Sequence, residues 1–149
     1  MKIWVDADAL PNAIKAIIVR AAEQRKIKTN FVANQPMRLK RSSFVNFMLV
    51  KPGENIADDE IVYGVESGDL VITADIPLAA QSVEKGALVL TPRGDILTHE
   101  NVREKLSVRD FMQELRNAGI ATTGPPAFGP RDKQKFANAF DRLLTRHVS

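Results

Sequence analysis

Residues 68–75 read GDLVITAD, and this stretch decides the fold that we predict. Residues 70–73 are almost entirely apolar, which is typical of a strand in the centre of a parallel sheet. A carboxylate, Asp75, stands two residues after that strand. The chain begins in the same way, because the mostly apolar residues 1–5 are followed by Asp6 and Asp8. In open parallel sheets, ligands bind beyond the carboxyl ends of the strands, so both motifs mark a candidate site.

Outward from these motifs, strand and helix patterns alternate up to residue 98. We expect strands at residues 2–5, 29–33, 44–50, 70–73 and 87–90, and helices near residues 11–25, 55–68 and 77–86. This alternation predicts a three-layer α/β/α fold with a central, mainly parallel, five-stranded sheet. Each expected helix has its own terminal signal, such as Asn55 as the cap of the second.

From residue 99 onward the pattern is helical only. Ser107 and Asp110 resemble a capping box, which predicts a helix that ends near Gly119 and buries Phe111, Met112 and Leu115. A last helix follows a Gly/Pro-rich connector and carries four apolar residues on one face: Phe136, Phe140, Leu143 and Leu144. We therefore expect residues 1–149 to form one domain, with an α/β core at 1–98 and a helical extension at 99–149.

The composition narrows the function further. The 149 residues contain no cysteine, which excludes disulfides, thiolate metal sites and a cysteine nucleophile and fits a cytoplasmic location. No apolar run has the length of a membrane span, and the stretch before Asp6 is too short for a signal peptide. The net charge of +3 arises entirely from residues 99–149, and the basic pI permits a nucleic-acid partner.

The carboxylates are the strongest candidates for chemistry. Asp6 and Asp75 end strands that we expect to be neighbours, so both can bind one hard cation such as Mg²⁺ or Mn²⁺. Three more acids are weaker candidates: Asp8, Asp58 and Asp95. Helix capping is an alternative role for Asp8 and Asp75, and the helix dipole explains acids near residue 58 equally well.

A basic cluster lies between the second and third strands. Arg38, Lys40 and Arg41 form it, either as an exposed loop or as contacts to a phosphate backbone near the acidic edge. His99 and His147 have no partners for a zinc site or a catalytic triad. Trp4 alternates with apolar neighbours and is expected to pack in the core.

Several stretches resemble the YaiI/YqxD family of uncharacterised bacterial proteins. They are VDADALP at residues 5–11, VANQP at 32–36, GDLVITADIPLA at 68–79, TPRG at 91–94 and RDFM at 109–112. The resemblance spans nearly the whole chain. Leu10 departs from it, since the family usually has cysteine there, so a thiol is not expected to be essential.

That family resembles, more distantly, the PIN-like nuclease domains, which carry an acidic pocket at the strand ends. The resemblance implies that Asp6, Asp58 and Asp75 are catalytic and metal-binding, with Asp8 and Asp95 as further metal ligands. Residues 73–75 match the T-x-D signature, and Thr73 and Asn34 would support the site. The implied activity is hydrolysis of RNA, more specifically single-stranded RNA, with Mg²⁺ or Mn²⁺ as cofactor.

Two other functions stay open at this point. The D-x-D motif also fits a haloacid-dehalogenase-type phosphatase, with Asp6 as nucleophile and Asp8 as general acid, but the acidic pair needed late in the chain is missing. A non-catalytic RNA- or protein-binding module would use the basic residues and leave the acids as caps. The C-terminal helices would cover the sheet, line a substrate groove or form a homodimer surface.

Overall fold

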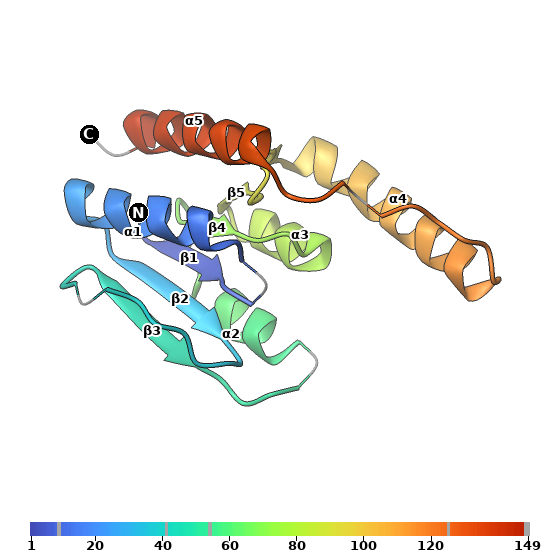
Figure 1. Ribbon diagram of the computed structural model, residues 1–149, viewed down its shortest axis with the longest axis horizontal. Helices are drawn as coiled ribbons and strands as arrows, with labels where there is room; N and C mark the ends of the chain where they lie inside the picture. The colour runs from blue at the N-terminus through green and yellow to red at the C-terminus, as the bar shows by residue number, and fades with distance from the viewer. Residues whose placement is uncertain (9, 41, 54, 125, 148–149) are drawn as a thin grey trace.

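The computed structural model describes residues 1–8, 10–40, 42–53, 55–124 and 126–147, and it confirms the predicted α/β class. Its described strands form a single sheet in the order β3-β2-β1-β4-β5-β6 (Figure 1). The sheet has six strands where five were expected. The bounds are β1 Ile3–Asp6, β2 Thr29–Ala33, β3 Val45–Leu49, β4 Leu70–Ile72, β5 Leu88–Leu90 and β6 Ile96–Leu97.

The additional strand, β6, is only two residues long and pairs antiparallel with β5, whereas β1 to β5 are all parallel. It was missed because two residues are too short to show a period-two pattern. The residues between β5 and β6 form a tight turn, in which the Thr91 carbonyl accepts the Gly94 N–H at 2.9 Å. That turn closes the edge of the sheet next to the last helix.

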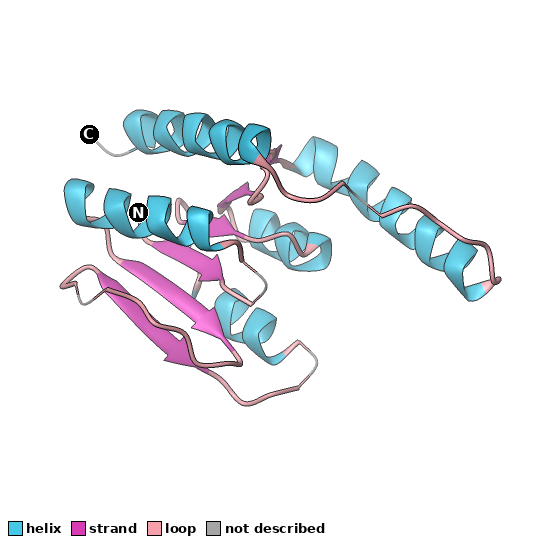
Figure 2. Cartoon of the chain, in the orientation of Figure 1, coloured by secondary structure: helices cyan, strands magenta, loops and turns pink. Residues whose placement is uncertain are grey.

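Helices cover both faces of the sheet, which gives three layers (Figure 2). On one face, α1 and α5 lie side by side; on the other lie α2 and α3, with α4 packed against α3 (Figure 1). The bounds are α1 Asn12–Arg25, α2 Ile56–Gly64, α3 Ile76–Glu84, α4 His99–Asn117 and α5 Pro130–His147. No helix in the described ranges is both long and apolar enough to cross a membrane.

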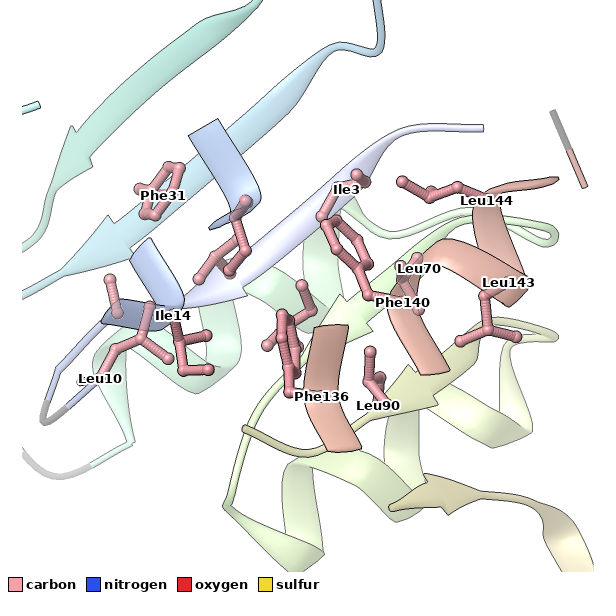
Figure 3. Packing of buried hydrophobic residues seen from close by; sticks show 14 of the residues in the cluster. Ile3, Leu10, Ile14, Phe31, Leu70, Leu90, Phe136, Phe140, Leu143 and Leu144 are labelled. Carbon is pink, nitrogen blue, oxygen red and sulfur yellow. The ribbon is translucent and has the colours of Figure 1, made fainter. Parts of the chain in front are cut away.

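The larger core cluster lies between the sheet and the pair α1 and α5. Successive strand residues point to opposite faces, so Ile3 and Val5 of β1 enter this cluster. Phe136 and Phe140 of α5 stack there with ring centroids 5.2 Å apart (Figure 3). The predicted apolar face of the last helix is thus confirmed, and it joins the C-terminal residues to the α/β core.

Trp4 belongs to the second core cluster, on the α2 and α3 side, as its pattern predicted. Its indole Nε1 donates a hydrogen bond to the buried Asp69 carboxylate at 3.2 Å. Asp69 also accepts backbone N–H groups from Lys2 and Glu66, both within 3.0 Å. The ring lies so close to Gly64 that a Cβ there would stand 2.3 Å from it. Glycine at this position is therefore required by packing.

The prediction for α4 was wrong in two respects. The helix begins at His99, eight residues before Ser107, and its capping box consists of Thr98 and Asn101. Ser107 lies inside the helix, where its hydroxyl donates to the Arg103 carbonyl at 3.1 Å. Of the three residues expected to be buried, Phe111 is 58% exposed, and Met112 and Leu115 are only half-buried. Apolar spacing on a helix shows which residues share a face, but not whether another element covers it.

Asn55 is also not the side-chain cap that we expected. It precedes α2, but its backbone is left-handed, with φ of 64°, and its side chain makes no capping hydrogen bond. Asparagine tolerates this conformation better than most residues. Its function is therefore to turn the chain into α2.

Candidate acidic site at the strand ends

The candidate site lies where the order of the strands reverses. From β1 the chain continues outward to β2 and β3 on one side, and then crosses to β4 on the other side. Asp6 is the last residue of β1, and Thr73 follows the last residue of β4. Because β1 and β4 are parallel neighbours, both residues reach the same edge of the sheet. This is the topological switch point at which open α/β sheets bind ligands.

Thr73 connects the two acidic motifs and is completely buried. Its hydroxyl donates a hydrogen bond to Asp6 Oδ2 at 2.7 Å and accepts the backbone N–H of Asp75 at 2.9 Å. One hydroxyl therefore fixes the Asp6 carboxylate and the chain direction that leads to Asp75.

Asp75 has the helix-capping role that we considered as an alternative to a role in the site. It occupies the N-cap position of α3, and its Oδ1 accepts the backbone N–H of Leu78 at 2.9 Å. That contact uses one carboxylate oxygen. The charge of the same carboxylate raises the pKa of Asp58, so capping does not remove Asp75 from the acidic edge.

Asp58 reaches this edge from the first turn of α2. The pKa of Asp58 is raised to about 7, mainly by burial and then by the charges of Asp75 and Asp6. Burial is also the main reason why the pKa of Asp6 is raised, against the lowering effect of its hydrogen bond from Thr73. Three carboxylates from three separate segments thus affect one another at one place.

Such a cluster can exchange protons near neutral pH or bind a hard cation, because both reduce the repulsion between like charges. The oxygen donors of Asp6, Asp58 and Asp75 suit Mg²⁺ or Mn²⁺ in chemical type. In their present side-chain arrangement, however, no group of three or more His, Cys, Asp or Glu residues within the described ranges is arranged to hold a metal ion.

Asp8 and Asp95 lie in different surroundings. Both Asp8 carboxylate oxygens accept the backbone N–H of Asn34, at 3.2 and 3.0 Å, so Asp8 fixes the end of β2. It does not cap α1, whose N-cap is Pro11, as we had considered. Asp95 pairs with Lys135 of α5 at 2.5 Å. Asp8 still contributes to the raised pKa of Asp6, whereas Asp95 is not among the charges that do so.

The basic residues Arg38 and Lys40 lie along α1, where they line a groove of about 550 Å³. The third predicted member of this cluster, Arg41, lies outside the described residues. Lys15 and Arg20 of α1 line the same groove and were missed by the sequence analysis. The signal available in the sequence was their position beside the buried stripe of α1, with Arg20 on the exposed face and Lys15 at its flank.

The fold and the acidic edge define an α/β protein with a carboxylate cluster at the switch point of a mainly parallel sheet. A family model described as "Uncharacterized BCR, YaiI/YqxD family" matches residues 4–146. The chain belongs to this family, as the resemblance of its motifs predicted.

Relatives match over nearly their whole length. A UPF0178 protein of Desulfotalea psychrophila is 58% identical over 146 residues, covering 98% of this chain and 99% of the relative. UPF0178 proteins of Syntrophotalea carbinolica and Saccharophagus degradans are 55% and 53% identical, covering at least 97% of either chain. A comparison with solved structures gives no match.

Proposed function

We propose that this protein is a metal-dependent phosphodiesterase that hydrolyses single-stranded RNA at the acidic edge formed by Asp6, Asp58 and Asp75. One observation carries the proposal: these three carboxylates lie at the switch point of the sheet, where burial and the charges of Asp75 and Asp6 raise the pKa of Asp58 to about 7. A cluster of carboxylates whose negative charges repel one another is typical of a functional site. The resemblance to PIN-like domains adds the reaction class by analogy of fold.

Asp6, Asp58 and Asp75 would hold Mg²⁺ or Mn²⁺, which supplies a metal-activated water and offsets charge on the scissile phosphate. The protein's own contribution begins with Thr73, whose hydroxyl orients Asp6 from a buried position. Asp58 must lose its proton before it can bind a cation. Metal affinity should therefore rise with pH up to about 7, the pKa of Asp58.

The test uses Asp75→Asn, because asparagine keeps the oxygen that caps α3 and removes only the charge. Wild type and variant are compared for Mn²⁺-dependent cleavage of end-labelled single-stranded RNA, and for Mn²⁺ binding by calorimetry. Asp110→Asn, on the exposed side of α4, is the matched control. We expect loss of both cleavage and metal binding in Asp75→Asn alone. Cleavage by Asp75→Asn at the wild-type rate would refute the proposal.

A non-catalytic RNA-binding module is the second candidate, and the groove along α1 favours it. Four cationic side chains line that groove: Lys15, Arg20, Arg38 and Lys40. Such a module would bind RNA in a salt-dependent way, without cleavage, and Asp75→Asn would leave binding unchanged. The cleavage assay therefore separates the two functions directly.

A further inference from the structure

The groove along α1 combines a strong positive charge with a defined direction. Beside its four cationic residues, a single carboxylate, Glu23, lines it within the described part of the chain. Glu23 Oε2 pairs with Lys40 at 3.3 Å, so it orients one of the four cations. The Lys40 side chain stays 74% exposed and remains accessible to a ligand. The groove therefore fits a polyanion.

The groove starts at the same edge of the sheet as the acids. Its lining runs from Asn12, the first residue of α1, to Gln24, near the end of that helix. The loop between β1 and α1 connects Asp6 to Asn12, so the beginning of α1 lies at the carboxyl ends of the strands. Twelve residues of helix span about 18 Å. That length corresponds to about five nucleotides if they are stacked with the rise of about 3.4 Å found in a duplex strand.

From this arrangement we infer that the groove binds the phosphate backbone of single-stranded RNA next to the acidic edge. Lys15 and Arg20 of α1 contact the phosphates together with Arg38 and Lys40 from the opposite wall. The described lining contains no aromatic side chain, so the contacts are to the backbone and do not depend on base sequence. This inference rests on the proposed function for the choice of RNA. It adds the surface along which the RNA substrate is held.

The experiment measures binding of a fluorescein-labelled, single-stranded RNA of mixed sequence by fluorescence anisotropy, in EDTA and over a range of salt concentrations. The test variant is Lys15→Gln/Arg20→Gln. Its control is Arg103→Gln/Arg146→Gln, which removes the same charge from exposed positions on α4 and α5. Thermal unfolding of each variant checks that it is folded.

We expect the groove variant to bind roughly 10-fold more weakly or worse at about 0.1 M salt. Its slope of log affinity against log salt should fall by about 1.4, since each phosphate contact on a single strand contributes about 0.7. The control pair should bind close to wild type. Glu23→Gln should bind more tightly, because it removes the carboxylate of the groove.

Equal weakening by both double variants would overturn the inference, since it would show an effect of net charge alone. Binding of anionic lipid vesicles in place of RNA would also overturn it. The two proposals fail separately. Cleavage with unaffected RNA binding in the groove variant refutes the groove and keeps the nuclease. Loss of binding in that variant, with no cleavage by wild type, keeps the groove and refutes the nuclease.

Discussion

The Thr73 hydroxyl lies 2.7 Å from Asp6 Oδ2, across the boundary between the two central strands β1 and β4. The same oxygen accepts the Asp75 backbone N–H at 2.9 Å. A buried hydroxyl that satisfies two partners is costly to remove, because both partners are then left without a hydrogen bond. Thr73 is thus the residue that couples the two acidic motifs.

Thr73→Val should destabilise the protein by about 1–3 kcal/mol, the usual cost of leaving a buried polar group unsatisfied. It should also raise the pKa of Asp6 further, since the hydrogen bond from Thr73 lowers that pKa. Denaturant unfolding and a nuclear magnetic resonance titration of Asp6 measure the two effects. Thr73→Ser keeps the hydroxyl and is the control. An unchanged titration in Thr73→Val would contradict this assignment.

Stability should depend on pH through Asp58. Its pKa is about 7 in the folded protein and near the ordinary value of 3.8 in the unfolded chain, so the folded state binds the additional proton between these limits. The contribution of Asp58 to the free energy of unfolding is then greatest below pH 4, and it falls as the pH rises to about 7. Asp6 acts in the same direction. Chemical denaturation across this pH range should show that the free energy of unfolding falls less steeply in Asp58→Asn than in wild type. An equally steep fall in the variant would exclude Asp58 as the cause.

Gly64→Ala should destabilise the protein, although the same change in an open helix stabilises it by up to about 1 kcal/mol. A Cβ at this position would lie 2.3 Å from the Trp4 ring, and overpacking of this kind typically costs about 1–3 kcal/mol. Trp4 is the single tryptophan, so its fluorescence reports unfolding directly. In a Trp4→Phe background, whose own unfolding is followed by circular dichroism, the cost should shrink. A stabilised Gly64→Ala variant would show that the contact is not tight.

Substitution of one phenylalanine on each C-terminal helix should show that α5 contributes to stability and that α4 contributes little. Phe136→Ala on α5 should cost about 3–5 kcal/mol, because the ring is fully buried in the larger core cluster. Phe111→Ala on α4 should stay within about 0.5 kcal/mol, since the ring is 58% exposed. Equilibrium unfolding at two protein concentrations measures both. A large, concentration-dependent cost for Phe111→Ala would mean that a second copy covers this face.

Much of the architecture was predictable from local pattern. β2 has the expected bounds, and α1 ends at the expected Arg25. The apolar face of α5 was predicted because Phe136, Phe140, Leu143 and Leu144 follow helical spacing. β6 was not predicted, since a strand of two residues is too short to show a periodic pattern. The start of α4 was not predicted, since the sequence offers a second acceptable cap at Ser107 besides the true cap, Thr98.

The candidate site was predictable in the choice of its acids but not in their interactions. Apolar runs before Asp6 and Asp75 indicated strand ends, and parallel strands bring such ends to one edge. The sequence could not show that Thr73 bridges them or that Asp8 would bind the Asn34 N–H, because both contacts join segments far apart in the chain.

The sequence by itself therefore determined the α/β class, the membership of the YaiI/YqxD family and the identity of the carboxylates, because these depend on residue type and short-range period. Only the tertiary structure decided which carboxylates affect one another and which basic residues share a groove. Those relationships depend on the strand order, which brings β1 beside β4 and the 38–40 segment beside α1. The same packing leaves Phe111 of α4 58% exposed.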